Sequence, residues 1–435
     1  MKLWWLGAAL TILGSSAGLC ADQPASLTLE QALAAVETTN LNVLLGRETI
    51  AQAVGLAEQL RAGILPNIDL GAQQQRTKTV NIINRQAVPT TPQNRFNGTL
   101  TGQYAFLDPS QIANVRAARV GISVAQAAYS ATLQVVLASV ADSYFTHLRN
   151  LKRIVVLDAN TARARSLLDL ARNQAAAGVA TRIDVTRAES EVALAEQARL
   201  QQDTVVYQSA QQLQRELDIN PSLSLVLADF AVLRVPVNDF AASLEKSAFE
   251  QRADWLQAQK AVEQAKASTR AASFERLPSL DVAGNYGIIS PVLGDTTEGQ
   301  WGIGLGLSMP IFDGFRISAD RRIALSRQRA QELQLHFLEF QISGEVRLAM
   351  QDANSRFKQI AVAENSLRLA EEEVRLAEQR YQQGVADNLE VVDAQNSLAV
   401  ASDNLNEAIY DYNLSRVELA RSRGNVRSIL TEKAP

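Results

Sequence analysis

Two long stretches of the chain place hydrophobic residues at alternating spacings of three and four. This spacing puts one apolar stripe along a helix and is typical of coiled coils. The stretches cover residues 110–177 and 315–383, and neither contains proline, so each predicts one unbroken helix. At about 1.5 Å per residue, each helix would be roughly 100 Å long. The stripe positions are Leu133, Leu137, Val140, Tyr144, Leu148, Leu151 and Val155 in the first stretch, and Leu367, Ala370, Val374, Ala377 and Tyr381 in the second.

Four shorter segments instead alternate apolar and polar residues, which predicts β-strands with one face of each kind. They cover residues 67–78, 96–107, 279–289 and 300–311. Strands of about ten residues can cross a membrane when tilted, but the smallest closed membrane barrels need about eight strands. Four strands alone would leave two open edges in lipid. The sequence therefore leaves two alternatives, a soluble sheet or a barrel to which several chains contribute.

Part of the chain occurs twice. Residues 178–189 align with residues 384–395, and five of the twelve pairs are identical. In each copy a Gly-Val-Ala sequence lies between two helical segments, so that Gly ends one helix and Thr181 or Asp387 begins the next. The repeat therefore predicts two helical hairpins.

The whole order of elements is also duplicated, and the predicted fold class is α+β, mainly α. Each half contains a short helix, two strands and a long hairpin whose return helix covers only half of the outgoing one. The short helices at 29–63 and 244–275 would stack end to end with the return helices. The chain then divides into a first repeat, 22–217, with its tip at 178–184; a mid-rod linker, 218–243; a second repeat, 244–423, with its tip at 384–390; and a C-terminal tail, 424–435.

The first 21 residues have one positive charge, a short apolar core and a small-residue exit, which predicts a signal peptide cut after Ala21. The only cysteine, Cys20, would leave with this segment. The alternative is a lipid anchor on Cys20, although Leu19 stands where lipoprotein signals carry a small residue. Without Cys20 the mature chain could form neither disulfides nor thiolate metal sites.

Composition argues against several classes of function. The net charge of −4 gives no basic excess, so no nucleic-acid partner is expected. The mean hydropathy is close to zero, which excludes a polytopic helical membrane protein. The sequence shows no nucleophile paired with a base, no phosphate-binding loop and no cluster of metal ligands. We therefore expect neither an enzyme nor a bound cofactor or metal.

The duplication, the order of elements and the Gly-Val-Ala bends together resemble the TolC-like outer-membrane efflux proteins, over essentially all of the mature chain. The resemblance implies a homotrimer in the outer membrane of a Gram-negative bacterium. Four strands per chain would form a twelve-stranded β-barrel, and the helices a periplasmic α-barrel whose tips open and close.

The implied function is that of a passive exit duct in a tripartite efflux or type I secretion system. The implied partners are a periplasmic adaptor (membrane fusion) protein, an inner-membrane pump of the RND or ABC type, and outer-membrane lipid. The alternative is a peripheral periplasmic coiled-coil scaffold without a channel, in which the strands form a small soluble sheet.

The resemblance also assigns roles to particular residues. The family's gate falls on Tyr381, Glu390, Asp393 and Asp184, with Arg182 in place of a family arginine whose position is occupied by Ala386. Three copies of the acids around a narrow axis would favour cations, and Tyr381 would hydrogen-bond a neighbour. The adaptor would dock on the two tips, which are Gly178, Val179, Ala180, Gly384, Val385 and Ala386.

Each of these residues also has a simpler interpretation. Tyr381 continues the helical spacing, so it can be a packing residue. Glu390 and Asp393 lie near a helix start, where the helix dipole favours acids. Tyr104 and Trp301 are either aromatics at the membrane interface or ordinary strand residues.

Overall fold

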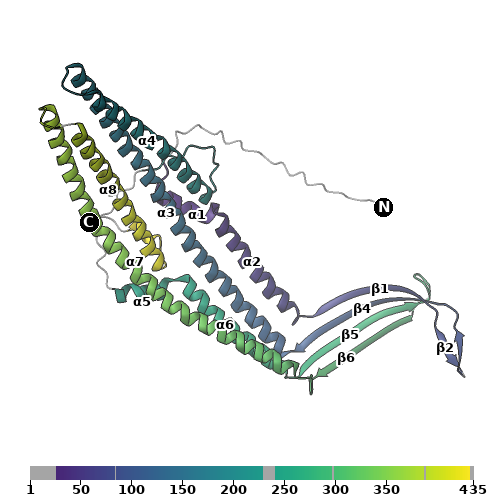
Figure 1. The fold of residues 1–435 in the computed structure, drawn as a ribbon. Helices are drawn as coiled ribbons and strands as arrows, with labels where there is room; N and C mark the ends of the chain where they lie inside the picture. The colour runs from purple at the N-terminus through teal and green to yellow at the C-terminus, as the bar shows by residue number, and fades with distance from the viewer. Residues whose placement is uncertain (1–25, 84, 229–240, 296–297, 387, 432–435) are drawn as a thin grey trace, which may run out of the picture.

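The computed structural model describes residues 26–83, 85–228, 241–295, 298–386 and 388–431, as a rod of helices with a sheet at one end (Figure 1). The predicted signal peptide, with Cys20, lies outside the described residues. The fold is mainly helical with a small antiparallel sheet, which confirms the predicted fold class at this level.

Two long helices form the rod. Helix α3 spans Pro109–Ala176 and helix α7 spans Arg316–Gln382, each without a break. Their return helices are α4, Arg182–Glu216, and α8, Asn388–Ser422. Most of the predicted stripe is buried or partly buried, but Val155 is 64% exposed. The three-four spacing therefore identified the packed face of both helices, with Val155 of α3 as the exception.

The remainder of the rod is covered by helix pairs where the sequence predicted single helices. Residues 29–63 form α1, Leu29–Thr39, and α2, Leu41–Ala62; the second half has α5, Ala241–Gln251, and α6, Ala253–Phe274. The breaks fall at Asn40 and Arg252, which both have extended backbone.

Both break residues are buried and make polar contacts that a continuous helix would not provide. The Asn40 carboxamide oxygen accepts from the backbone N–H of Asn42, at 3.0 Å, and its nitrogen donates to the carbonyl of Glu216, at 2.7 Å. Arg252 forms ion pairs with Asp254, at 2.6 Å, and Glu345, at 2.7 Å. These long-range partners explain why local spacing did not predict the breaks.

The sheet has the strand order β1-β4-β5-β6, and every neighbouring pair is antiparallel. Its strands are β1, Asn67–Thr77; β4, Gln93–Leu107; β5, Ser279–Ser290; and β6, Glu298–Ser308. The register aligns residues of one kind across the sheet: Leu70, Leu100, Tyr286 and Trp301 occupy one row. The next row, Thr101, Asn285 and Gly302, lies on the opposite face. One face is therefore mainly apolar, although Gln74 and Arg76 lie on it at the far end of β1, and the other face is mainly polar or glycine.

The strand ends differ from the predicted segments by up to three residues; β4, for example, begins at Gln93 rather than at residue 96. Strand β6 ends at Ser308, three residues before the predicted end, and Pro310, which lacks a backbone donor, follows it. The segment between the first two predicted strands contains a small hairpin of its own, β2, Val80–Ile83, with β3, Gln86–Pro89.

The largest core lies midway along the rod, where α1, α3, α4 and α8 meet the short C-terminal helix α9, Ser428–Thr431. The described part of the predicted linker joins this core through Ile219, Leu225 and Leu227. Tyr144 of α3 is fully buried there, and its hydroxyl lies 2.7 Å from the carbonyl of Ala228.

Candidate functional site at the hairpin tips

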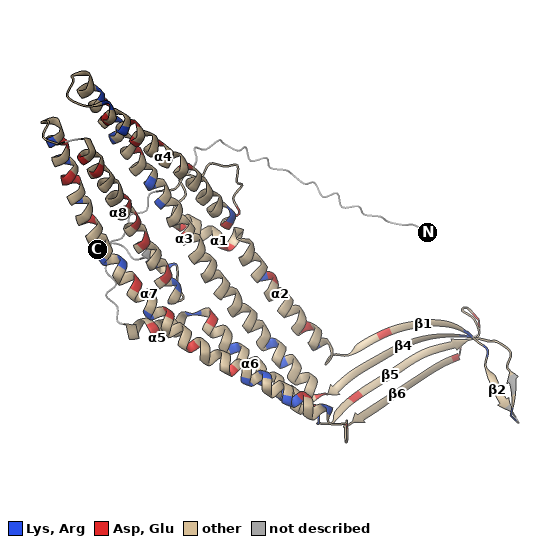
Figure 2. Cartoon of the chain, viewed as in Figure 1, with Lys and Arg blue, Asp and Glu red and all other residues tan. Residues whose placement is uncertain are grey.

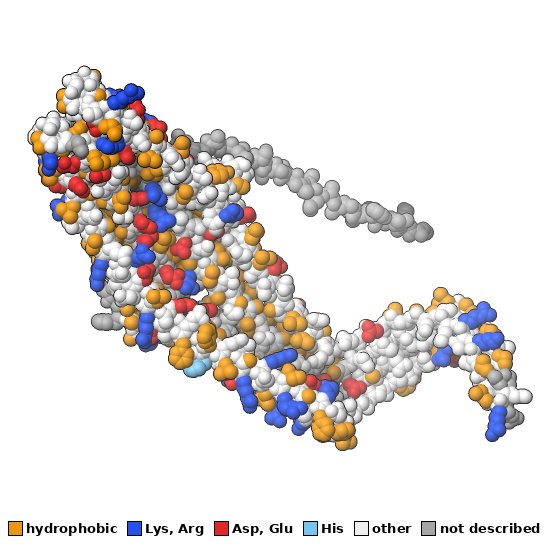
Figure 3. Space-filling view, in the orientation of Figure 1, with side chains coloured by type: hydrophobic (Ala, Val, Ile, Leu, Met, Phe, Trp, Pro, Cys, Tyr) orange, Lys and Arg blue, Asp and Glu red, His pale blue; other side chains and the backbone are white. Residues whose placement is uncertain are grey.

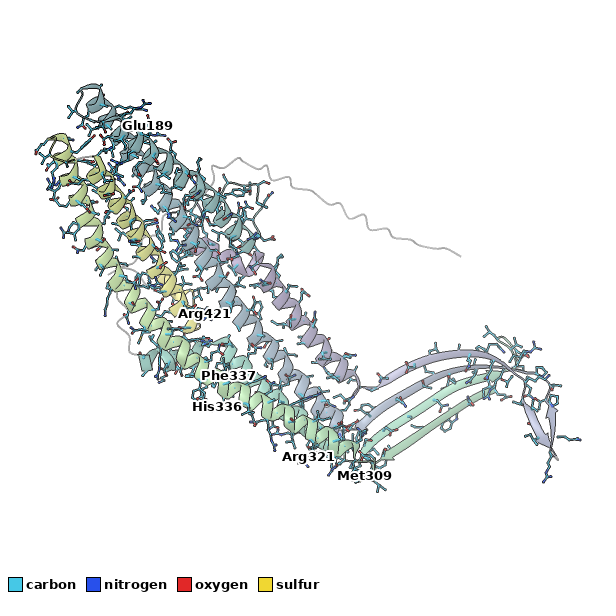
Figure 4. All side chains as sticks on the ribbon, viewed as in Figure 1. Glu189, Met309, Arg321, His336, Phe337 and Arg421 are labelled. Atoms are coloured by element: carbon cyan, nitrogen blue, oxygen red, sulfur yellow. The ribbon has the colours of Figure 1, made fainter. Side chains whose placement is uncertain are left out.

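The tip of the first hairpin joins α3 to α4. Gly178 has a left-handed backbone, with φ of +74°, which glycine adopts without strain. The N–H of Val179 then donates to the carbonyl of Gln174, at 2.9 Å, and closes the end of α3. Helix α4 starts at its N-cap Thr181, whose N–H and hydroxyl both donate to Asp184, at 2.9 and 2.6 Å. Figure 4 labels Glu189 on this hairpin.

The tip of the second hairpin has the same geometry. Gly384 has φ of +69°, and the N–H of Val385 donates to the carbonyl of Arg380, at 3.0 Å. Asp387, the expected first residue of the next helix, lies outside the described residues. The predicted docking residues Val179 and Val385 are 69% and 68% exposed. Both tips therefore present one valine to the surroundings on a helix-closing turn.

The three predicted gate acids differ in their contacts. Asp184 bonds to Thr181, and these hydrogen bonds hold the pKa of its carboxyl below the usual range, with an added contribution from Arg187, at 3.7 Å. Glu390 forms an ion pair with Arg380, at 3.3 Å, across its own hairpin. Asp393 is exposed on α8. One acid of the second hairpin is thus paired and the other faces out.

Tyr381 lies in a packed cluster. Its side chain is 5% exposed and contacts a cluster that includes Val374, Ala377 and Val391. Its hydroxyl is buried and has no hydrogen-bond partner among the described residues. Burial, together with the charge of Asp184, raises the pKa of this phenol above its usual value. The structure therefore brings Tyr381 near Asp184 without a hydrogen bond between them.

Arg182, the expected substitute for the family arginine, is exposed and forms no ion pair with the described residues. The residue at the equivalent place in the second repeat, Asn388, makes the contact between the two tips. Its amide nitrogen donates to the carbonyl of Asp184, at 3.0 Å, and its side chain is 1% exposed. Sequence reasoning missed Asn388, although the alignment of the repeats paired it with Arg182.

Between the tips and the middle of the rod, the hairpins enclose a groove of about 320 Å³. Arg163 of α3 lies in it and hydrogen-bonds to Asn160. Burial lowers the pKa of the Arg163 guanidinium, and the charge of Glu378 opposes this effect. The groove is lined by Leu157, Asn160, Arg163 and Ala164 of α3, by Glu191, Leu194, Ala195 and Ala198 of α4, and by Val392, Gln395, Asn396 and Ala399 of α8.

Farther from the tips, α3 and α8 are joined by ion pairs. Arg153 binds Asp403, at 2.6 Å, and Arg149 binds Asp411, at 3.5 Å. Asn406 also donates to the carbonyl of Arg149, at 3.3 Å. The hairpins are thus fixed together in the middle of the rod, whereas Asn388 makes the polar link at their tips.

The tip region has few features that would suit a bound metal. Within the described residues, no three His, Cys, Asp or Glu side chains come close enough together to hold a metal ion. The polar groups of the tips are instead committed to helix ends and to contacts between helices.

Comparison with known proteins gives consistent results. A model of the family described as outer membrane efflux protein matches residues 39–217 and 244–425. Nodulation protein T of Rhizobium leguminosarum bv. trifolii is 23% identical over 386 residues, which cover 86% of this chain and 80% of that protein. Outer membrane protein OprJ of Pseudomonas aeruginosa is 27% identical over 291 residues, which cover 62% of this chain and 57% of that protein.

A solved structure shows the same fold. The Campylobacter jejuni CmeC outer membrane channel superposes with a TM-score of 0.78 at 18% identity, over 93% of this chain and 88% of that one.

Proposed function

Since this chain belongs to the outer membrane efflux protein family, we propose that three copies of it assemble into the exit duct of a tripartite export system. The protein is an outer-membrane efflux protein of a Gram-negative bacterium. The homotrimer, the twelve-stranded barrel, the gate and the partners are the parts that we propose. The observation that carries them is a sheet that is open at both edges and has one mainly apolar, exposed face.

The sheet has edges that suit a barrel. Its edge strands are β1 and β6, and because all neighbours are antiparallel, β1 runs opposite to β6. Strand β6 of one copy can therefore pair with β1 of the next and keep the up-down order without interruption. Three copies would give twelve strands with no free edge, which satisfies every backbone donor and acceptor in the bilayer.

The apolar face of the sheet is strongly exposed. On β6 its residues are Trp301, Ile303, Leu305 and Leu307, each 70–77% exposed. An exposed apolar face of this extent marks contact with lipid or with another protein. It argues against the alternative of a soluble scaffold, because such a scaffold would have to cover this face with its own helices, and Figure 1 shows no described helix over the sheet. In the proposed barrel this face, with Tyr104 and Trp301, meets lipid.

The helices carry matching apolar edges. Exposed residues on α7 include Leu333, Phe337 and Phe340, at 67–70% exposure, and α2 exposes Leu41 and Leu45, at 61% and 64%. Helices α2 and α7 lie at opposite edges of the helical layer in Figure 1, and Figure 4 shows Phe337 on α7. We therefore place α7 of one copy against α2 of the next.

One more helix has an apolar stretch that this chain leaves uncovered. Helix α3 has a segment that is long and apolar enough to cross a membrane by length and composition alone, and 17% of it is buried. Neighbouring copies in the α-barrel would cover this stretch.

At the far end of the rod, the tips would form the gate. In the resting protein, Asn388 holds the second hairpin to the first, and Arg380 neutralises Glu390. Opening would separate the hairpins at this link. Asp393, already exposed, would then line a negative constriction in three copies and favour cations. We keep Arg182 outside this network and assign Tyr381 to packing.

Energy for transport would come from an inner-membrane pump of the RND or ABC type. A periplasmic adaptor would bind the exposed tips, including Val179 and Val385. The chain is thus a passive duct rather than an enzyme.

The proposal is tested by extracting the protein from membranes and adding it to planar bilayers. We expect detergent-dependent trimers that resist dissociation in cold SDS and that conduct ions in discrete steps. A water-soluble monomer without conductance would support the scaffold and refute the duct.

A further inference from the structure

The junction between β6 and α7 has features that neither the barrel nor the gate requires. This junction, which we call the foot, comprises residues 309–322. Its exposed large apolar side chains are Met309, Ile311, Phe312 and Phe315, exposed by 60%, 97%, 78% and 71%. The rings of Phe312 and Phe315 meet edge to face, with centroids 5.6 Å apart. Figure 4 labels Met309 at this end of the rod.

The backbone of the foot is strained at Phe315. Gly314 and Phe315 have consecutive left-handed conformations, with φ of +67° and +69°. Glycine tolerates this region, but for a bulky side chain it is a clear outlier that costs of the order of 1 kcal/mol or more. Phe315 is nevertheless the N-cap of α7, and its ring points into solvent. A strained backbone that exposes an apolar ring calls for a contact outside the chain.

The start of α7 also carries an excess of positive charge. Residues 313–329 contain five arginines and two aspartates, whereas the whole chain has a net charge of −4. Both aspartates are occupied: Asp313 accepts from the N–H of Ile317, at 2.7 Å, and Asp320 pairs with Arg316, at 3.1 Å. The other four arginines are exposed and lack ion pairs within the described part of the chain; they are Arg321, Arg322, Arg327 and Arg329.

Only Arg316 lies in the first turn of α7, where the positive end of the helix dipole disfavours a cation, and it is paired with Glu275, at 2.9 Å, as well as with Asp320. Arg321 and Arg322 are five and six residues beyond Arg316, hence roughly 8–9 Å along the axis. An external anion would offset the charge of these two arginines. Figure 2 shows blue ribbon segments gathered where α6 and α7 meet the sheet, and Figure 3 shows blue atoms beside exposed orange ones there.

The first repeat provides a comparison within the same chain. There α3 starts from Asp108, which has a relaxed backbone with φ of −134° and caps the helix through Gln111, at 2.9 Å. The first arginines of that helix, Arg116 and Arg119, come eight and eleven residues after Asp108 and are also exposed, whereas Arg321 and Arg322 come eight and nine residues after Asp313. The strained aromatic and the adjacent pair of arginines thus belong to the second repeat alone.

From these observations we infer that the foot binds the headgroups of anionic phospholipids in the periplasmic leaflet of the outer membrane. The inference rests on the proposed function, because it requires the apolar face of the sheet to lie in that membrane. Residues of this face run along β6 to Leu307 and continue into Met309 and Ile311, so the foot begins where the hydrocarbon layer ends. The aromatic rings would enter the boundary, and Arg321 and Arg322 would bind phosphate oxygens in the bidentate manner that guanidinium allows.

Of the four exposed arginines, Arg321 and Arg322 are the two that lie near the expected headgroups. They lie within one screening length of the headgroups, which is about 8–10 Å at physiological salt, whereas Arg327 and Arg329 are roughly 16–20 Å away from the start of α7. Another candidate partner is Glu58 of α2, which is exposed and would lie near this helix in a neighbouring copy. One carboxylate cannot neutralise both arginines, so lipid phosphate is the better match.

The test compares lipid binding to the purified oligomer by native mass spectrometry, with phosphatidylglycerol and phosphatidylcholine offered in equal amounts. A basic residue at an anionic surface contributes a factor of roughly five, so R321Q/R322Q should lower phosphatidylglycerol binding about 25-fold and lower binding of the zwitterionic phosphatidylcholine much less. F315G, which relieves the strain and removes the ring, should keep the fold and weaken both lipids about tenfold. The matched control is R368Q/R375Q, which makes the same charge change on α7 roughly 70–80 Å away.

Four results would overturn the inference. The first two are equal binding of both lipids by the wild type and an unchanged lipid preference in R321Q/R322Q. The third is displacement of phosphatidylglycerol by inorganic phosphate alone. The fourth is dissociation of the R321Q/R322Q oligomer in phosphatidylcholine as well as in phosphatidylglycerol. The last would assign the arginines to the neighbouring copy. Conductance is measured for each variant in parallel: a conducting wild type without lipid preference overturns the foot alone, whereas a wild type that does not conduct refutes the duct.

Discussion

The link between the hairpin tips makes a quantitative prediction about opening. Replacing Asn388 with alanine removes the hydrogen bond from its amide to the carbonyl of Asp184. A buried hydrogen bond of this kind contributes about 1 kcal/mol net, because the separated groups regain water. The carboxamide oxygen of Asn388 has no partner among the described residues, so removing this oxygen breaks no further hydrogen bond.

In a trimer that opens in one step, three such links break together. The loss is then about 3 kcal/mol, which corresponds to a factor of roughly 150 in the ratio of open to closed channels. If the copies open independently, the factor is about five for each. The open probability of single channels in planar bilayers measures this ratio directly and distinguishes the two cases.

Asn406 provides the matched control. It also lies on α8 and donates to a backbone carbonyl of the first hairpin, that of Arg149 at 3.3 Å, but in the middle of the rod. Asn406→Ala should therefore change stability by a similar amount without raising the open probability. An N388A channel that opens no more often than the wild type, or an N406A channel that opens equally often, would show that the tips are not held by this bond.

Three further predictions concern other parts of the molecule. Changing Glu390 and Asp393 together to alanine should reduce cation preference, measured as a reversal potential closer to zero in a salt gradient, and an unchanged potential would remove both from the constriction. Leu305→Arg on the apolar face should lower the stability of the barrel in the membrane by about 2–4 kcal/mol per copy near the bilayer centre, and so reduce the yield of heat-resistant oligomer. Thr101→Arg on the polar face should leave that yield unchanged. Equal yields of the two variants would contradict a lipid-facing sheet. Although Asp142 reaches the surface, the protein packed around its carboxyl, followed by repulsion from Glu418, raises its pKa to about 7 from the model-peptide value of 3.8. The folded protein then holds a proton that the unfolded chain releases, so stability should fall as pH rises from about 4 to 7, and Asp142→Asn should flatten this slope in thermal unfolding; parallel slopes would contradict the assignment.

Much of the architecture could be predicted from local patterns. The absence of proline from 110–177 and 315–383, with apolar spacings of three and four, was enough to predict two helices of this length. Alternation was enough for the strands, because a two-faced strand must separate its apolar and polar residues. The tips could be predicted because Gly178 and Gly384 permit the left-handed turn that ends a helix.

The candidate site could be predicted only in part. The resemblance identified the acids of the tips, but Arg380 as the partner of Glu390 and Asn388 as the link between hairpins depend on which helices meet. Tyr381 was expected to form a hydrogen bond to a neighbour, and within this chain it is buried among apolar side chains. We therefore assign Tyr381 to packing rather than to a hydrogen bond with a neighbouring copy.

The sequence alone determined the elements, since helix spacing, strand alternation and glycine turns are local properties of the chain. Tertiary structure decided the breaks at Asn40 and Arg252, the polar partner of Asn388 and the strained exposure of Phe315. Each of these depends on contacts between residues that are far apart in the chain, or on a backbone conformation that the residue type itself disfavours. Local pattern carries no information about either.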